Sequence, residues 1–161
     1  MSRGVLIALA IALLLLWGCG GRKPPHEGKS AVQLERMLHD ADPNVQSQGA
    51  LGLALLGPEA RAAVPALTEC LHSPHVLVRQ NAAAALTKVG PEAAPAVPAL
   101  IKCLTDSEWT VRRLAAQALG KIGPAAVSAI PDLEKLLQDP DSLVQREAET
   151  ALKLLCPSAE K

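Results

Sequence analysis

The chain has 161 residues, in which 16 lysines and arginines balance 16 aspartates and glutamates. This balance argues against a nucleic-acid-binding protein, which needs a basic face, and gives no electrostatic reason to lie on an anionic membrane. Two Trp are present but neither Phe nor Tyr, so a domain of this length must build its core from Leu, Ala and Val.

The N-terminal segment has the features of an export signal. Arg3 precedes an unbroken apolar run over residues 5–16, which is short for a spanning helix of about 20 apolar residues. The sequence Leu-Trp-Gly-Cys at residues 16–19 resembles the lipobox of bacterial lipoproteins. The resemblance implies a lipoprotein signal peptide over residues 1–18 and a lipid on Cys19, which would attach the protein to a membrane. An ordinary cleaved signal and an uncleaved anchor are the alternatives.

The segment after the signal predicts a tether. Residues 19–29 combine the lipidated Cys19 with a stretch rich in Gly, Pro and charge, which we expect to be extended and mobile. The resemblance to lipoproteins also implies a place in the bacterial cell envelope, with the domain in the periplasm or outside the cell. Gly20 after the cysteine favours the outer membrane where a cell has two membranes.

Residues 30–156 consist of a repeat with a period of 33 residues. The positions that share this spacing include Leu34, Leu67, Leu100 and Leu133, and also Val45, Val78, Val111 and Val144. A fixed period of this size predicts a solenoid, because each unit buries its apolar face only by stacking on its neighbours. Four units fill the range and leave residues 157–161 as a tail.

Each unit is predicted to contain two helices. In the third unit, apolar residues at helical spacing place them at residues 96–104 and 108–122. Gly57, Gly90 and Gly123 lie where a glycine with positive φ ends a helix, and each is followed by proline.

Helix starts are also predicted from the sequence. Ser30 with Gln33 predicts a capping box. We expect an N-cap followed by a proline at the first helical position at Asp42, Ser73 and Asp139, since each precedes a proline.

The second helix of the third unit carries a specific pattern, Asp-x-x-x-x-Val-Arg-x-x-Ala-Ala-x-Ala-Leu-x-x-x-Gly, from Asp106 to Gly123. It resembles the second helix of short HEAT-type repeats, of the kind also found in phycobilisome-lyase-like proteins. The resemblance implies an all-α protein, an α-solenoid of four two-helix HEAT-like repeats. Ankyrin and tetratricopeptide repeats have the same or nearly the same period, but their signature residues are absent.

The resemblance also implies structural roles. In similar repeats the arginine of this pattern hydrogen-bonds the turns between helices, so Arg79 and Arg112 are expected to form a ladder with Asp106 and Asp139. A role in ligand binding is the alternative.

In HEAT-like arrays the second helices line the concave face, which implies that a partner binds there. Helix geometry predicts that one stripe of residues is presented on this face. The stripe consists of Ser47, Ala50, Leu51 and Ala54; Gln80, Ala83, Ala84 and Thr87; Arg113, Ala116, Gln117 and Gly120; and Arg146, Glu149, Thr150 and Lys153. A solvated helix face without a ligand is the alternative.

Trp109 stands out as the one aromatic residue after Cys19. Arg113 follows one helical turn later, within reach of a cation–π contact, and these two residue types anchor interfaces. The predicted partner-binding residues are Trp109, Arg113, Gln80, Gln117, Arg146 and Lys153. The alternative for Trp109 is that it fills a gap against the neighbouring unit.

The sequence shows no catalytic signature and no glycine-rich phosphate loop, so we expect neither an enzyme nor a cofactor. His39, His72 and His75 could hold a metal, but the stacked pair His39 and His72 is expected to lie too far apart, and no carboxylate or cysteine completes a set, so no metal site is expected. Cys70 and Cys103, one repeat apart, are expected to be buried free thiols, because stacked helices lie farther apart than a disulfide spans.

Together these features predict a monomeric, lipid-anchored scaffold or adaptor that binds a protein or peptide partner on its concave face and no nucleic acid. Two alternatives remain. One is a bilin-lyase-like protein that binds a chromophore, and the other is a structural spacer with no dedicated ligand.

Overall fold

The structure is a computed structural model that describes residues 26–156. The predicted signal peptide, the predicted lipidation site Cys19 and the predicted tail lie outside the described residues. The helices are α2 (Ala31–Leu38), α3 (Pro43–Leu56), α4 (Val64–Cys70), α5 (Val76–Val89), α6 (Val97–Cys103), α7 (Trp109–Ile122), α8 (Ile130–Lys135) and α9 (Ser142–Leu155). Short 3₁₀ helices join them at Gly57–Ala63, Gly90–Ala96, Gly123–Ala129 and Leu136–Gln138.

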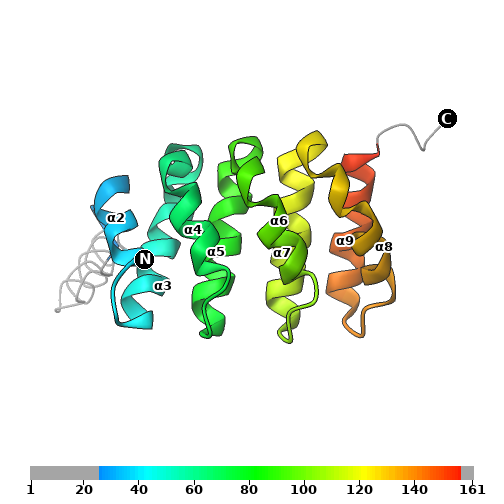
Figure 1. Ribbon diagram of the computed structural model, residues 1–161, viewed down its shortest axis with the longest axis horizontal. Coiled ribbons are helices and arrows are strands. Elements are labelled where there is room, and N and C mark those ends of the chain that lie inside the picture. Colours follow the sequence, from blue (N-terminus) through cyan, green and yellow to red (C-terminus); the bar gives the residue numbers. More distant parts are fainter. Residues whose placement is uncertain (1–25, 157–161) are drawn as a thin grey trace, which may run out of the picture.

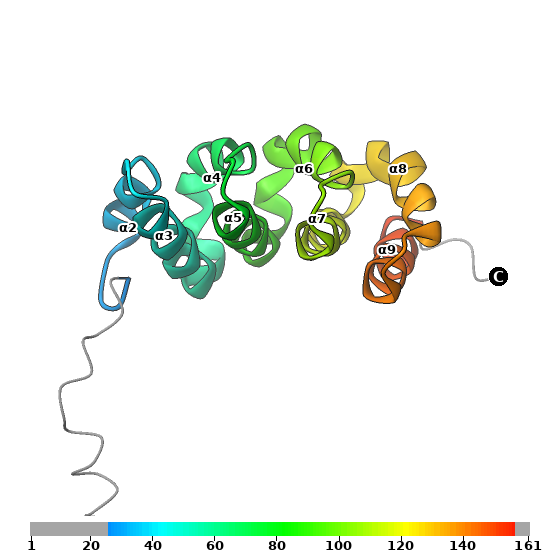
Figure 2. The same cartoon turned by 90° about the horizontal axis from the view of Figure 1, so that it is seen from below.

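The helices are stacked in pairs along one axis, as Figure 1 shows. Helices α2, α4, α6 and α8 form an outer row, and α3, α5, α7 and α9 form an inner row on the concave side of a shallow arc (Figure 2). Each inner helix packs on the inner helices of the adjacent repeats. The predicted all-α solenoid of four two-helix repeats is therefore confirmed.

The core is built from Leu, Ile, Val and Ala, as the absence of Phe and Tyr requires. The leucines that open the repeat, Leu34, Leu67, Leu100 and Leu133, are all essentially inaccessible to solvent. Between successive inner helices lie Ala50, Ala83 and Ala116, each with no exposed surface. Small side chains at these positions let the inner helices approach closely, so one continuous core runs through the whole array.

A glycine with positive φ ends the inner helix of each of the first three repeats. Gly57, Gly90 and Gly123 have φ values of 61°, 76° and 76°, which a residue with a side chain rarely adopts. The proline that follows starts a 3₁₀ helix leading into the outer helix of the next repeat. The predicted helix ends are thus confirmed, whereas the seven-residue 3₁₀ segments were not foreseen.

The predicted helix starts are confirmed in part. Ser30 and Gln33 form the expected capping box, and Asp42 caps α3, which has Pro43 in its first turn. The predictions for Ser73 and Asp139 are wrong, because α5 and α9 begin two residues later than expected. The Ser73 hydroxyl accepts a hydrogen bond from the His75 backbone N–H, and the Asp139 carboxylate accepts one from the Asp141 backbone N–H. These side chains stabilise the inter-helix turn instead of the helix end.

The first repeat differs from the others at two glycines of α3. A Cβ on Gly49 would lie 2.8 Å from the Leu34 carbonyl oxygen, and one on Gly52 would lie 2.5 Å from a Leu34 methyl carbon and 2.9 Å from His26 Cβ. Glycine has a low helix propensity, which suggests that these residues loosen α3. Their role here is instead to leave room for α2 and the preceding segment to pack closely on α3. Residues 26–29 accordingly form a turn on α3 and not the extended tether that the sequence predicted.

One apolar run, Pro43–Cys70, is long and hydrophobic enough to span a membrane by composition alone. Half of its most apolar window is buried inside the array, and the run changes direction at Gly57. Core packing of the first two repeats therefore accounts for its hydropathy.

Candidate binding surface

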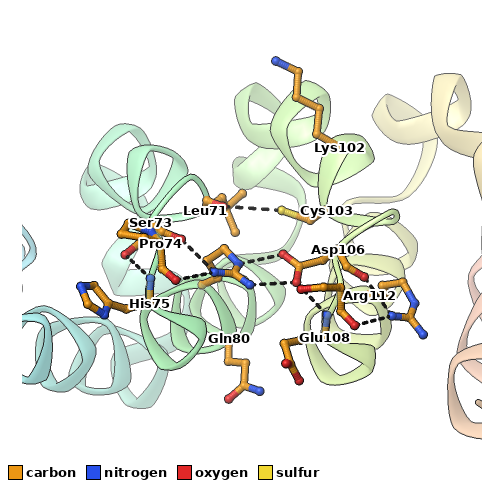
Figure 3. A network of polar contacts seen from close by, with 12 residues as sticks. Leu71, Ser73, Pro74, His75, Gln80, Lys102, Cys103, Asp106, Glu108 and Arg112 are labelled. Carbon is orange, nitrogen blue, oxygen red and sulfur yellow. Dashed lines mark hydrogen bonds and ion pairs between the residues drawn. The ribbon is translucent and has the colours of Figure 1, made fainter.

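The arginines and aspartates of the repeat pattern form a ladder along one edge of the array. Arg79 donates from Nε and Nη2 to the two carboxylate oxygens of Asp106, at 2.7 and 2.9 Å. Arg112 repeats the arrangement with Asp139, at 2.7 and 2.8 Å. Arg112 Nη1 also donates to the Asp106 carbonyl oxygen, so the two bridges share Asp106 (Figure 3).

The ladder shifts the pKa values of its acids. Burial acts to raise the pKa of Asp106, but the hydrogen bonds from Arg79 and from the Glu108 backbone N–H outweigh it and leave the pKa below its usual value. Hydrogen bonds from Arg112 hold the pKa of Asp139 low, against the effect of burial. Both acids are thus ionised at neutral pH, and each clamps two adjacent repeats together.

The ladder is absent between the first two repeats. Gln46 and Ser73 occupy the positions of the arginine and the aspartate, and the Gln46 amide turns back to the Asp40 carbonyl oxygen at 2.7 Å. An open cavity of about 480 Å³ lies at this junction. Its lining includes His39, Glu69, Cys70, His72 and His75, among others.

This cavity collects several potential metal ligands, but it does not arrange them around one point. Among the residues that the structure describes, no three His, Cys, Asp or Glu side chains are placed to hold one metal ion. Cys70 and Cys103 are buried free thiols, and burial raises the pKa of each to about 11. A thiol with so high a pKa is a poor nucleophile at neutral pH.

The stripe predicted for the concave face requires a correction. Ala50, Ala83 and Ala116 are fully buried at the seams between repeats, and Gly120 lies against Ala151. The predicted stripe is rotated toward the following repeat. The middle inner helices α5 and α7 are each covered on three sides, by their own outer helix and by both neighbouring inner helices. Only in the last repeat, which has no successor, are Arg146, Glu149, Thr150 and Lys153 all exposed.

The concave surface is formed by the accessible residues of the inner helices, on the side away from the outer row (Figure 2). We define it by four positions of the repeat, one on each turn of the helix. They are Asn44, Gln48, Leu51 and Leu55 on α3; Leu77, Asn81, Ala84 and Lys88 on α5; Thr110, Leu114, Gln117 and Lys121 on α7; and Leu143, Glu147, Thr150 and Leu154 on α9.

Trp109 lies at the start of α7, beside this surface, with 37% of its area exposed. The Arg113 guanidinium carbon lies 5.9 Å from the Trp109 ring centroid, within cation–π distance. Arg113 Nε is buried and has no hydrogen-bond partner. Within the described residues Arg113 makes no ion pair. The structure thus brings these two predicted residues together, with the Trp109 ring partly exposed and Arg113 half-buried beside it.

The other predicted partner-binding residues are spread along the array. Gln80 donates to the Thr110 hydroxyl across the seam between α5 and α7. Gln117 lies on the concave surface, and Arg146 is exposed at the C-terminal end. Lys153 pairs with Glu149 at 2.9 Å on the open side of the last repeat. Trp109, Arg113 and Gln117 lie on one helix, whereas the remaining three are on neighbouring helices.

A groove of about 190 Å³ lies between α7 and α9 on the concave side. Gln117, Gly120 and Lys121 line it from α7, and Glu147, Thr150, Ala151 and Leu154 line it from α9. The sequence did not reveal this groove. One sequence feature could have indicated it. Gly120 on the inner helix of the third repeat replaces Ala54 and Thr87 of the first two repeats, and so leaves no side chain at the seam.

Comparison with protein families gives a direct match. Residues 31–97 and 64–153 match the family of HEAT repeats, so most of the chain is covered. The chain therefore belongs to the HEAT-repeat family, which confirms the resemblance found in the second helices. No curated protein matches the chain significantly.

Solved structures with the same fold are repeat proteins. An engineered protein is 29% identical with a TM-score of 0.70, over 80% of this chain and 63% of its own. A designed armadillo repeat protein in complex with the peptide (KR)4 is 21% identical with a TM-score of 0.69, over 76% of this chain and 62% of its own. The chain thus spans less than two thirds of either protein.

A natural protein is also similar. The complex of CpcE and CpcF of phycocyanin lyase from Nostoc is 24% identical with a TM-score of 0.57, over 86% of this chain and 70% of that chain. At this identity the likeness shows the fold alone. The family and the fold together define a HEAT- and armadillo-like repeat scaffold, an architecture that is consistent with protein binding.

Proposed function

We propose that this protein is a lipid-anchored adaptor of the bacterial cell envelope, and that its concave surface binds a protein or peptide partner. The observation that carries the proposal is Trp109 with Arg113, an exposed aromatic ring beside a guanidinium that has no partner among the described residues. Tryptophan and arginine dominate the binding energy of many interfaces. The repeat does not require them, because Val76 and Gln80 occupy the equivalent positions of the second repeat.

Exposed apolar side chains on the same face support the proposal. Leu55 and Leu77 are 70% and 61% exposed, and Leu143 and Leu154 are also accessible. Contiguous exposed apolar surface marks interaction sites, and these four leucines are the exposed apolar residues among the concave positions. A partner that covers them would gain hydrophobic stabilisation without any rearrangement of the array.

The start of the described chain relates the concave surface to the proposed anchor. The His26 ring nitrogen Nδ1 lies 2.8 Å from the Gln48 amide oxygen on α3, so the chain enters the array from the concave side. Six residues separate His26 from Cys19, and this length of chain spans at most about 25 Å. With Cys19 in a membrane, the concave surface of the first repeat would lie close to the bilayer. We therefore expect the partner to be membrane-associated.

Two alternatives are less well supported. The phycocyanin lyase complex shares the fold, but a tetrapyrrole site would find only one Phe, Trp or Tyr side chain, that of Trp109, on the described part of this chain. A spacer without a ligand would have no use for the exposed leucines and the unpartnered guanidinium.

The test is affinity capture of the full chain from native membranes with three versions of the protein. The wild type is compared with Trp109→Ala/Arg113→Glu and with Lys102→Glu, a control on the outer helix α6, where the lysine extends away from the array (Figure 3). A partner recovered by the wild type and the control but lost by the double variant would support the proposal. Equal recovery by all three would exclude this surface, and recovery of no partner would favour the spacer.

A further inference from the structure

The charged residues of the concave side are unevenly distributed. Lys88 and Lys121 lie on the concave surface itself, Arg113 lies beside it next to Trp109, and Arg146 is exposed at the C-terminal end. Glu147 is the one acidic residue among the concave positions, and the outward Glu149 is already paired with Lys153. The described concave side therefore carries an excess of positive charge, although the chain as a whole is neutral.

Two cations of α7 lie in or near the groove between α7 and α9. Lys121 lines the groove, and Arg113 lies two turns earlier on the same helix, next to Trp109. Eight residues of α-helix separate the two cations, which corresponds to about 12 Å along the helix axis. Arg113 makes no ion pair with any described residue. A carboxylate is the group that satisfies such a guanidinium best.

We propose that the groove between α7 and α9 binds an acidic segment of the partner protein, with one carboxylate at Arg113 and another at Lys121. The inference rests on the proposed function and adds the chemistry of the partner. In an extended segment, side chains four residues apart lie about 13 Å apart on one face, which matches the separation of the two cations. An apolar side chain of the segment packs on Leu154, which lines the groove, or on Trp109, next to Arg113.

The sign of the charge excludes other occupants. A basic segment would meet Arg113 and Lys121 with nothing but Glu147 to attract it. An anionic bilayer would suit the charge, but its flat surface cannot enter the groove on the inside of an arc (Figure 2). The acidic groups of this chain are mostly elsewhere, on the outer helices and in the inter-helix turns, and examples are Glu59, Glu92, Asp106 and Asp139.

The test measures binding of labelled peptides to the full chain by fluorescence anisotropy. One peptide alternates glutamate and alanine, a second has glutamine in place of glutamate, and a third alternates lysine and arginine. We expect affinity for the glutamate peptide alone. It should fall at least about tenfold in Arg113→Glu/Lys121→Glu. It should be unchanged in Arg61→Glu/Lys102→Glu, which alters the net charge equally but in the first 3₁₀ segment and on the outer helix α6.

Several results would overturn the inference. They are equal binding of the glutamine peptide, preference for the basic peptide, equal loss in both charge-reversed variants, or no binding of the glutamate peptide at millimolar concentration. Binding to anionic phosphatidylglycerol vesicles but not to the glutamate peptide would also overturn it, in favour of a lipid ligand. If Trp109→Ala loses the captured partner while Arg113→Glu/Lys121→Glu retains it, the adaptor function stands and the acidic partner is wrong. Circular dichroism of each variant checks that it is folded.

Discussion

Replacing Arg112 by alanine tests whether the ladder holds the repeats together. The substitution removes two hydrogen bonds to the Asp139 carboxylate and two to the carbonyl oxygens of Asp106 and Ser107. The two side chains of the bridge are only 14% and 4% exposed, so Asp139 would be left nearly buried without its counter-ion. Breaking a buried pair costs about 3–5 kcal/mol, and an exposed pair is worth about 0.2–1 kcal/mol. For this nearly buried pair we expect Arg112→Ala to lower the free energy of unfolding by about 2–3 kcal/mol.

The assay is urea and thermal unfolding followed by circular dichroism at 222 nm (a helix signal). A loss of this size would lower Tm by roughly 10 °C for a domain of this length. Lys135→Ala is the matched control, because Lys135 and Asp132 form an exposed pair whose lysine is 75% exposed. That control should change stability by less than about 0.5 kcal/mol. A cost for Arg112→Ala as small as that of the control would refute the ladder as a source of stability. A double-mutant cycle with Asp139→Asn should give a coupling of about 1–2 kcal/mol.

Three further predictions follow from the packing, the pKa shifts and the signal sequence. Gly49→Ala should lower the free energy of unfolding by about 1–2 kcal/mol, since the new methyl group meets the backbone of α2. At an exposed helical glycine the same change would raise it by about 1 kcal/mol, and such a rise in unfolding experiments would contradict the prediction. The pKa values of Asp106 and Asp139 are lowered in the folded protein, so these two acids stabilise the fold when the pH is above the ordinary aspartate pKa of about 3.9. This contribution is lost as the pH falls below that value. The Tm of the wild type should therefore fall more steeply between about pH 5 and pH 2 than that of Asp106→Asn/Asp139→Asn, and parallel curves would exclude the mechanism. Cys19→Ala should release the protein from the membrane fraction or block its maturation; unchanged fractionation would show that the lipobox interpretation is wrong.

The period and the helix pairs were predictable from the sequence because they depend on strong local signals. Leucines at a fixed spacing and glycines at helix ends identify the repeat regardless of how the repeats stack. The pairing of Arg79 with Asp106 could be expected only through resemblance to similar repeats. The two residues are 27 positions apart, and nothing local connects them.

The orientation of the inner helices was not predictable in the same way. Alanine occupies both the core face and the seams, as Ala82 and Ala83 show with no exposed surface on either. A helix that is apolar on three sides has only a weak hydrophobic periodicity in its sequence. The sequence alone therefore does not show which face stays accessible, because that depends on where the neighbouring helices lie. The N-caps predicted at Ser73 and Asp139 were wrong because the sequence pattern fits two structures. Ser and Asp before proline fit an N-cap, but they also fit a turn in which the side chain accepts from a backbone N–H two residues ahead.

The most direct test of the account is site-specific photocrosslinking in intact cells. A photoreactive amino acid replaces either Gln117, which lines the groove on the concave surface, or Lys102, on the outer helix α6. We expect a crosslink to one membrane-associated protein from Gln117 and none from Lys102, with the crosslink lost in Trp109→Ala/Arg113→Glu. A crosslink from Lys102 but not from Gln117 would show that the partner binds the convex side and would contradict the account.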